Sequence, residues 1–587
     1  MRGKETIHHP PFKKLRSAQL ALGIGLLLCA TLRLDAEISP PPGGASGLTL
    51  SNLVQLVLER NETLQSKLLD FEVSRQRHLA EKGVFEPDLV GSFNHEVNNR
   101  PNNAEQQNTD QNSVLHETNN IYDGGLESLI PTGAKLHLGY TLSDLHNNIF
   151  PSGLFSGGLT SNLNQLQYQT FIGVTVDQPL LKNFGPAVTM AGIRIAALSS
   201  KIAFQEYRRQ LMTVVSTAEA TYWNLYLSQQ QEQFFEDSVH TAETILNDNR
   251  TRLEAGKGSE LEVMEAQAGL GLRRAKLGEA QQKVVEAANR VVSFYAGRAD
   301  GTNQFLRALD APTLREEHMD FDFLGSIAFT ANPDYVIQEE KVDQELIKLG
   351  YARNQRLPQF DLKGAYGYNG LGATPEESWD AAERTHFLSW SIGAEFRIPL
   401  GATKVRHEYT AAELQVQSAE LALQGLQTEI FNGLDTARHK VLSLRDSVAS
   451  YQSAVDYNRT LLDSAMTRLQ AGKLESRKVL DIEADLFEAR NSVVESLVRY
   501  QIAWLEMQVL SGGLLRQRNL DISQEDLQRT TRDMLKDRGS SGANFLHGNN
   551  EQNAYYPKGV GASPYNDSAL RDALHRKESE LENPSGK

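Results

Sequence analysis

The heptapeptide Thr-Arg-Leu-Glu-Ala-Gly-Lys occupies residues 251–257, and its near copy Thr-Arg-Leu-Gln-Ala-Gly-Lys occupies residues 467–473. The same spacing holds downstream as well, where Val263 corresponds to Val479. Repetition at a fixed spacing is the mark of a structural unit that occurs more than once. The sequence therefore predicts two related halves, each with a long helix, a tight glycine turn and a returning helix.

The repeat continues upstream, where Val-Asp-Gln-Pro-Leu at 176–180 corresponds to Phe-Arg-Ile-Pro-Leu at 396–400. These segments join a region of strand character to the long helix, and the helical stretches before the strands end near Pro87 and Pro358. The predicted organisation begins with a signal peptide (1–36). The first half (48–297) consists of a helix, barrel strands at about 88–178 and a long helical hairpin at 186–297, and a linker (298–320) follows it. The second half (321–512) consists of a helix, barrel strands at about 359–398 and a long helical hairpin at 402–511, and a polar tail (513–587) that is disordered or loosely wrapped ends the sequence.

The long helix of the second half, from about Ala402 to Ala471, carries an apolar seam with alternating spacings of three and four residues. The seam consists of Leu434, Ala437, Val441, Leu444, Val448, Tyr451, Val455, Asn458, Leu462, Ala465 and Leu469. This heptad pattern predicts a left-handed coiled coil. About 70 residues at about 1.5 Å each give roughly 105 Å, which is longer than a compact bundle needs. Shorter helices at 259–297 and 321–357, stacked end to end, would match this length, and so would 475–511 with 48–86.

Several stretches alternate between apolar and polar residues, which is the pattern of a strand with two different faces. The clearest is 388–398, where Leu, Trp, Ile, Ala, Phe and Ile fall on one face. Similar alternation occurs at 89–97, 136–142, 172–177 and 360–369, and a weaker candidate covers 121–130. Long polar segments at 98–118 and 145–167 indicate exposed loops, and Pro131-Thr132-Gly133 indicates a short turn.

Alternation alone also fits a soluble antiparallel sheet with one wet face. However, the segment 388–398 has the length of a tilted strand that crosses a bilayer, which needs about 9–11 residues. Short turns on one side and long loops on the other are typical of outer-membrane barrels. Two strands in one half and up to four in the other cannot close a barrel, and open edges do not sit in lipid. The pattern thus predicts a barrel completed by further copies of the chain in a cyclic homo-oligomer.

The N-terminus and the composition narrow the class of protein. A basic opening and an apolar run from Leu20 to Ala30 predict a secretory signal peptide, with an uncleaved anchoring helix and lipidation of Cys29, the one cysteine, as alternatives. No stretch beyond residue 40 approaches 18 consecutive apolar residues, which excludes a multi-span helical membrane protein. The formal charge of −15 argues against a nucleic-acid partner.

The sequence predicts no catalytic, cofactor-binding or metal-binding site. Gly256-Lys257-Gly258-Ser259 lacks the earlier glycine and the strand-to-helix context of a phosphate loop. No histidines have a recognisable helical metal spacing, and there is no nucleophile elbow. We therefore expect a protein that is not an enzyme.

The duplicated halves, the steps Gln178-Pro179-Leu180-Leu181 and Ile398-Pro399-Leu400-Gly401, and the paired glycine turns resemble the outer-membrane efflux protein family, the TolC-like outer-membrane factors. The resemblance covers about 48–512. It implies an α+β membrane protein in which a long α-helical coiled-coil barrel continues a transmembrane β-barrel completed by trimerisation. It also implies a passive conduit from the periplasm to the exterior, within a tripartite efflux or type I secretion system.

The same resemblance implies a location in the outer membrane, with a periplasmic helical portion. The implied partners are two further copies of the chain, outer-membrane lipid, a periplasmic adaptor (membrane fusion protein) and an inner-membrane pump. The pump would be of the resistance-nodulation-division, ABC or major facilitator type. The exported substrate is not implied, because selectivity is expected to lie in the pump.

The resemblance assigns roles to five residues. Gly256 and Gly472 match the tip glycines where family members meet the adaptor, although a left-handed glycine after a helix end also explains both. Asp481 matches an acidic tunnel constriction, and the acid that often precedes it by one turn is here Lys478. This departure speaks against a strongly cation-selective gate. Glu262 is expected to hold the tip closed by pairing across helices with Arg477 or Lys478.

Other classes of protein remain open at this point. A periplasmic adaptor or coiled-coil scaffold would have no pore, but an adaptor would have one helical hairpin, and a scaffold would lack the long alternating strands. A secreted enzyme with an unrecognised site is the third alternative. Only the channel is expected to need detergent and to run as a heat-modifiable trimer.

Overall fold

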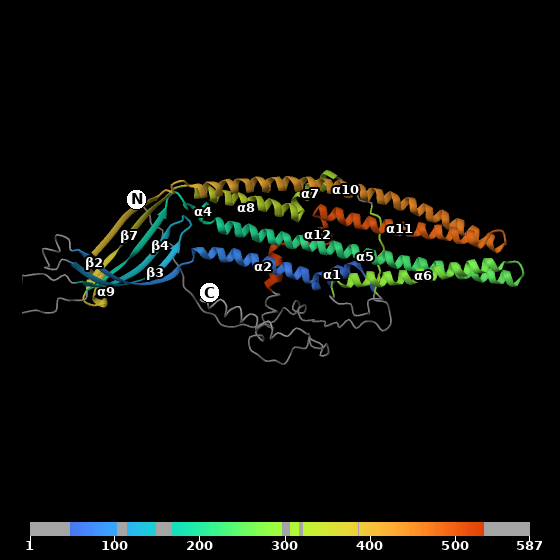
Figure 1. Ribbon diagram of the computed structural model, residues 1–587, viewed down its shortest axis with the longest axis horizontal. Helices are drawn as coiled ribbons and strands as arrows, with labels where there is room; N and C mark the ends of the chain where they lie inside the picture. The colour runs from blue at the N-terminus through green and yellow to red at the C-terminus, as the bar shows by residue number, and fades with distance from the viewer. Residues whose placement is uncertain are drawn as a thin grey trace, which may run out of the picture.

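The computed structural model describes residues 47–101, 114–147, 167–295, 306–315, 321–385 and 387–532. In this part of the chain, a six-stranded antiparallel sheet lies at one end of an elongated bundle of helices (Figure 1). The predicted signal peptide with Cys29, most of the linker, the central parts of the two long loops and the tail from 533 onward lie outside the described residues.

The sheet has the order β2-β3-β4-β5-β7-β8, and every neighbouring pair is antiparallel. Its strands are β2 (Asp88–Pro101), β3 (Val114–Leu129), β4 (Lys135–Asn147), β5 (Gln167–Pro179), β7 (Gln359–Gly372) and β8 (Phe387–Arg397). The first half of the chain supplies four strands and the second half two. The halves therefore meet within the sheet, where β5 pairs with β7.

The strands predicted from alternation are all present, but their ends differ from the prediction. The weak candidate at 121–130 corresponds to the second half of β3, the longest of the described strands. Its alternation is weak because Gly124 and Gly125 interrupt it, but the backbone is extended through both glycines. Pairing of β2 with β3 reaches Pro101 and Val114, so the first polar segment predicted as a loop begins and ends as strand. Polar side chains thus extend the sheet beyond its apolar part.

Two long helices form the spine of the molecule. Helix α5 (Ala191–Glu254) has 64 residues and α10 (Thr403–Gln470) has 68. At about 1.5 Å per residue, each is about 100 Å long, which agrees with the roughly 105 Å expected for the second from its residue count. The predicted seam of α10 is buried at both ends, from Leu434 to Val448 and again at Ala465 and Leu469, but opens at Tyr451.

Each half also contains a helix that the sequence analysis treated as continuous and that is broken in the structure. The first half has α1 (Leu50–Arg60) and α2 (Glu62–Lys82), and the second has α7 (Phe321–Ala331) and α8 (Pro333–Gln355). Asn61 and Asn332 lie at the two breaks, where each side chain caps the following helix. Their amide nitrogens are therefore free to donate elsewhere.

These amides correct the predicted stacking of the short helices. Asn61 Nδ2 donates to the carbonyl of Phe294, just after α6 (Glu260–Val292), at 3.1 Å. Asn332 Nδ2 donates to the carbonyl of Leu510, the last residue of α11 (Ser476–Leu510), at 2.9 Å. The return paths are thus α6 with α2 and α11 with α8, each within one half, rather than across halves as predicted. Along the spine, α5 packs against α2, α6, α8 and α11, whereas α10 packs against α8 and α11.

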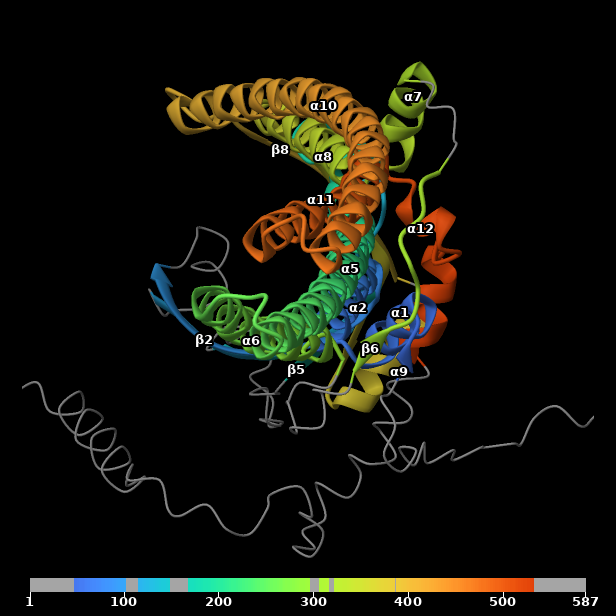
Figure 2. The ribbon, with the colours of Figure 1, turned by 90° about the vertical axis from the view of Figure 1, so that its right-hand side faces the viewer.

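Seen along the long axis, α10, α5 and α6 follow an open arc, and α1, α7 and α12 (Leu514–Gln517) lie on its convex side (Figure 2). The linker contributes β6 (Arg307–Ala308), which pairs with β1 (Gly47–Leu48) on the same side. The remaining short elements are the 3₁₀ turn η1 (Gly83–Phe85), α4 (Pro186–Thr189) and α9 (Pro375–Thr385).

The start of the predicted tail, which was expected to be disordered or loosely wrapped, is ordered up to residue 532 in the structure. Leu514, Leu515 and Leu527 are buried in the main core, and residues 524–532 are helical. Arg518 forms an ion pair of 2.5 Å with Glu219 of α5. Burial raises the pKa of the Glu219 carboxyl above its ordinary value, against the opposing charge of Arg518.

None of the helices described here is both long enough and apolar enough to cross a membrane.

Candidate functional site

One face of the sheet is apolar over most of its length. Side chains paired across antiparallel strands share a face, so the register sorts them into rows. One row across all six strands consists of Leu89, Leu126, Leu138, Val174, Tyr366 and Trp390. Leu89 is 85% exposed and Trp390 68% exposed. The predicted apolar sides of the five clear strands all lie on this one surface, which we call the apolar face.

The apolar face has the height of a bilayer core. It begins with the row that contains Phe360 and Phe396 and ends with the row that contains Phe93, Tyr122 and Leu142. These rows are about ten residues apart, or about 33 Å along a strand, which corresponds to about 25 Å at a tilt of about 40°. This is the height of the apolar band of an outer-membrane barrel.

Beyond the band, the same face becomes polar. Asn120 Nδ2 donates to Asp144 Oδ2 at 2.8 Å, and His95 Nδ1 lies at hydrogen-bond distance, 2.7 Å, from Asn120 Oδ1. Helix α9 packs over the last rows of the apolar face on β5 and β7, where the rings of Trp379 and Tyr140 lie 5.0 Å apart. The band is therefore bounded at the end far from the helices.

The opposite face of the sheet, which we call the polar face, carries charges and hydroxyl groups. Thr141 Oγ1 donates to Asp123 Oδ2 at 2.7 Å. Lys363 forms an ion pair of 2.6 Å with Glu395, near the helical end of the sheet. A sheet with an apolar and a polar face separates two environments, and the exposure of both faces shows that neither is the core of this chain.

At the other end of the molecule, the two helical hairpins close with the same turn. The φ angles of Gly256 and Gly472 are both +69°, which confirms the predicted left-handed conformation. Lys257 N donates to Arg252 O and Lys473 N to Arg468 O, both at 2.9 Å, as in a Schellman motif. Both glycines are exposed, and the turns that join α5 to α6 and α10 to α11 lie at the end of the molecule far from the sheet (Figure 1).

Glu262 does not make the ion pair that was expected of it. Its carboxylate accepts a hydrogen bond from the backbone N–H of Ser259, in a capping box that begins α6. Among the ion pairs of the described residues, none joins Glu262 to Arg477 or Lys478. A serine three positions before a glutamate at a helix start is the signature of this box, which competes for the carboxylate.

Asn249, which the sequence analysis did not single out, makes a polar contact between the two tips. Its Nδ2 donates to the carbonyl of Glu262 and to Ser476 Oγ, both at 3.1 Å. Asn249 and Ser476 are buried. One amide of α5 therefore joins the starts of α6 and α11.

Lys478 and Asp481 lie on the exposed side of α11, and Asp485 and Glu488 continue the same side at spacings of four and three residues. The opposite side of α11 packs into the small core of the tip through Val479 and Ile482. The predicted constriction residues are thus free to face a solvent-filled space.

A buried ion pair lies on the packed side of α11 at the same level. Arg273 of α6 contacts Glu483 through Nη2 at 2.5 Å, and its Nε donates to Ser238 Oγ of α5 at 3.0 Å. The Glu483 side chain is only 8% exposed. Glu483 falls between Val479 and Leu486 in the apolar stripe of the helix, a signal that the sequence analysis overlooked. The pair joins the α5–α6 hairpin to the α10–α11 hairpin.

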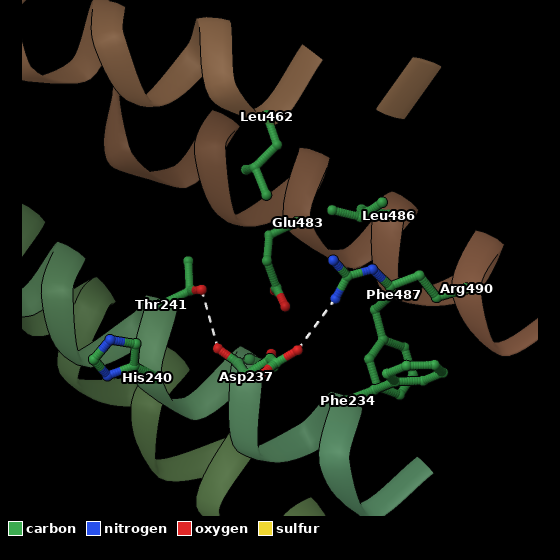
Figure 3. A pocket seen from close by; sticks show the side chains of 10 residues that line it. Phe234, Asp237, His240, Thr241, Leu462, Glu483, Leu486, Phe487 and Arg490 are labelled. Carbon is green, nitrogen blue, oxygen red and sulfur yellow. Dashed lines mark hydrogen bonds and ion pairs between the residues drawn. The ribbon is translucent and has the colours of Figure 1, made fainter. Parts of the chain in front are cut away.

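Beside this pair, α5, α10 and α11 enclose a groove of about 240 Å³ (Figure 3). Arg490 Nη1 donates to Asp237 Oδ2 at 3.3 Å, and its guanidinium lies 5.8 Å from the centre of the Phe234 ring. Phe487 completes the aromatic wall, 4.5 Å from Phe235. The two hairpins are thus joined at three successive levels, by Asn249, by Arg273 and by Arg490.

Comparison with known proteins decides between the classes that the sequence left open. The family model described as outer membrane efflux protein matches residues 153–297 and 325–513. The chain belongs to this family. The resemblance found in the repeats and turns is therefore confirmed. Of the classes left open, the family is that of outer-membrane efflux or secretion channels with a periplasmic helical portion, rather than adaptors, scaffolds or enzymes.

Individual relatives agree with this assignment. The chain is 23% identical over 368 residues to the "Proteases secretion protein PrtF" of Dickeya chrysanthemi, which covers 61% of this chain and 76% of the relative. It is 20% identical over 356 residues to the "Alkaline protease secretion protein AprF" of Pseudomonas aeruginosa, with 59% and 70% covered. The fold is similar to the CmeC outer membrane channel of Campylobacter jejuni, with a TM-score of 0.56 at 14% identity over 82% of this chain and 88% of that one.

Proposed function

We infer that three copies of this chain form one conduit, which crosses the outer membrane as a closed β-barrel and the periplasm as a helical tunnel. This inference rests on the exposed apolar band of about 25 Å on a sheet whose two edge strands, within the described residues, each pair on one side only. Lipid would cover the apolar face, and the polar face would line the pore. Closing the sheet requires other copies, because open strand edges are not stable in a bilayer.

The helices support the same assembly. A single chain forms only part of a ring, since α5, α6 and α10 follow an open arc (Figure 2). Whereas α5 packs against α2 and α6 of its own half and α8 and α11 of the other, the long helices that α10 packs against, α8 and α11, both belong to its own half. Tyr457 and Leu461, on the free side of α10, are exposed. A neighbouring copy would cover this side and continue the arc into a tube.

The tips are the proposed docking site for a periplasmic adaptor, with Gly256 and Gly472 at the apex of the two hairpins. The two turns have the same backbone geometry, so that three copies would present six similar turns to an adaptor. An inner-membrane pump would deliver the substrate through this assembly. The described residues offer no feature that selects one pump class.

Asp481 and Lys478 are the proposed lining of the narrowest part of the tunnel. Three carboxylates and three ammonium groups in one ring would give a weaker charge preference than carboxylates alone. Glu262 acts beside them by beginning α6 at the required angle, through its capping box, rather than by an ion pair. The buried pair of Arg273 and Glu483 would hold the hairpins in the closed arrangement.

The cargo would be a secreted protein or a small molecule. Two relatives are named for the secretion of proteases, and a third, 26% identical over 185 residues, is named a fusaric acid resistance protein. The match covers only 32% of that third relative. The longer matches therefore favour export of polypeptides.

Reconstitution in planar lipid bilayers tests the conduit directly. Purified protein is expected to produce discrete conductance steps without ATP, because a passive pore needs no energy source. Denatured protein from the same preparation is the control. Absence of steps from protein that is folded and inserted would contradict the proposal.

A further inference from the structure

We propose that β8 of one copy pairs with β2 of the next copy in a register that repeats the β5–β7 pairing, which gives a barrel of 18 strands with a wide lumen. The proposal rests on the trimer inferred above and adds the seam, the strand number and the bore. Six strands from each of three copies give 18.

The two edge strands, β2 and β8, are oriented so that they can pair with each other. Five successive antiparallel pairings separate β2 from β8, so these two strands run in opposite directions. Within the described residues, each has a neighbour on one side only. An antiparallel pair between β8 and the β2 of another copy therefore continues the sheet without a reversal of its pattern.

The internal duplication provides a template for the register of this pair. The Pro-Leu turn after β5 corresponds to the Pro-Leu turn after β8, and Pro87 before β2 corresponds to Pro358 before β7. Within the chain, Val176 pairs with Gly364 and Ile172 with Tyr368. The turns align Val176 with Phe396 and Ile172 with Ile392, and the prolines align Gly364 with Phe93 and Tyr368 with Val97. The equivalent pairs at the seam are therefore Phe396 with Phe93, and Ile392 with Val97.

The faces provide an independent check on this register. Phe396, Phe93, Ile392 and Val97 all belong to the apolar face, so the predicted seam keeps the apolar side chains of both strands on one surface. A slip of one residue would turn every apolar side chain of one strand toward the lumen. The positions of the turns and prolines define these correspondences independently of the two faces.

The segment that follows β8 is also exposed at a position where its counterpart in the first half is paired. Within the chain, Leu180 N continues the β5–β7 ladder by donating to Phe360 O at 2.8 Å. Its counterpart Leu400 is 99% exposed. The template places Leu400 N against the carbonyl of Leu89 in the next copy. Within the chain, α5 packs against α8, and their counterparts are α10 and α2. The template therefore brings the exposed Leu414 and Leu421 of α10 onto α2 of the next copy.

The number of strands determines the diameter of the barrel. At a strand spacing of about 4.8 Å and a tilt of about 40°, 18 strands close into a cylinder about 36 Å across between backbones, whereas four strands per copy would give about 24 Å. Barrels of 16 to 18 strands leave an aqueous channel. The lumen in the membrane would therefore admit polypeptide chains with little hindrance.

A row of glycines on the polar face keeps large side chains against the wall. Gly125, Gly139, Gly173 and Gly367 are paired in register on four adjacent strands. A Cβ atom on either Gly173 or Gly367 would lie 2.6 Å from Cζ of Phe171, so this ring lies flat over both positions. His137 lies in the same way over Gly139 and Gly125. Neither ring projects into the lumen.

Disulfide trapping in the outer membrane tests the seam. The template pairs Ser391 of β8 with Asn98 of β2, both on the polar face, as the counterparts of Phe171 and Asn369. Full-length protein with N98C and S391C is expected to give reducible covalent dimers and trimers after mild oxidation, and none larger. The matched control is N94C with S391C, about four residues out of register and therefore about 13 Å too far apart.

The barrel diameter, measured on the purified trimer by electron cryomicroscopy, is the second readout. Trapping by N98C with S391C and a diameter of about 36 Å would support the proposal. A trimer with a barrel of about 24 Å, or one trapped equally by the control pair, would overturn it and leave the conduit intact. A chain that is monomeric outside membranes would overturn the conduit itself.

Discussion

Gly256 and Gly472 lie in different halves of the chain and share a φ of +69°, each at the apex of a helical hairpin. No heavy atom lies within 4 Å of a Cβ built on Gly256, and only a flexible end of Arg252 approaches one on Gly472. The glycines are therefore required by backbone conformation and not by crowding. The duplication has preserved the one feature of the tips that a side chain would disturb.

Replacing either glycine with alanine is expected to destabilise its turn by about 1 kcal/mol, because the left-handed region is unfavourable for residues with a Cβ. The measurement is amide hydrogen exchange at 252–257 and 468–473, which should become faster. Gly271→Ala is the matched control, since Gly271 lies within α6 with open space around it. There, alanine should stabilise the helix by about 0.5–1 kcal/mol. Equal effects at all three positions would contradict this account of the turns.

Arg273→Met is expected to leave the Glu483 carboxylate buried without its partner, at a cost of about 3–5 kcal/mol. The hairpins should separate more readily, and conductance in planar bilayers should increase. Arg274 provides the comparison, because its pair with Glu243 is exposed, at 61% and 40% of the side chains. Arg274→Met should cost less than about 1 kcal/mol. If both variants conduct like the unmodified protein, the buried pair does not hold the tunnel closed.

Asp481→Ala is expected to reduce the cation preference of the pore, and Lys478→Ala to increase it, because the two charges oppose each other in one ring. Reversal potentials under a salt gradient measure this preference. Asp435, on the exposed side of α10, serves as a control for a change of charge alone. An unchanged preference in both variants would place the constriction elsewhere.

Glu219 is expected to make stability depend on pH in the direction opposite to an ordinary surface acid. Burial raises the pKa of its carboxyl in the folded protein, so the folded state binds its proton more tightly than the unfolded state does. Its contribution to stability is therefore greatest below the unfolded pKa of about 4.3 and declines as pH rises through the raised value. The melting temperature of Glu219→Gln in detergent should lack this decline. A parallel pH profile for the two proteins would contradict the assignment.

The sequence predicted the parts of this fold that depend on local pattern. Strict alternation at 388–398 sufficed for β8 and for the face on which Trp390 lies, and the heptads sufficed for the length of α10. The paired turns were predictable because a left-handed residue after a helix leaves glycine in the sequence. Local pattern also led to the family, through repeats rather than through any one motif.

Contacts between distant segments were not predictable in this way. The stacking of the short helices depends on hydrogen bonds from Asn61 and Asn332. An asparagine at a helix break indicates a cap, but it does not indicate which distant carbonyl its amide will bind. The sequence contains the signature of the capping box, Ser259 three positions before Glu262, although an ion pair of Glu262 with Arg477 or Lys478 was predicted instead. The ordered start of the tail depends on Leu514 and Leu527, which join a core whose α5 members lie in the other half of the chain.

The oligomeric state of the purified mature chain tests the central claim most directly. Extraction from the outer membrane should require detergent, and light scattering of the extracted protein should give the mass of three chains, which heating separates into single ones. A polypeptide that remains in aqueous buffer as a single chain, with its apolar face still exposed, would contradict the account.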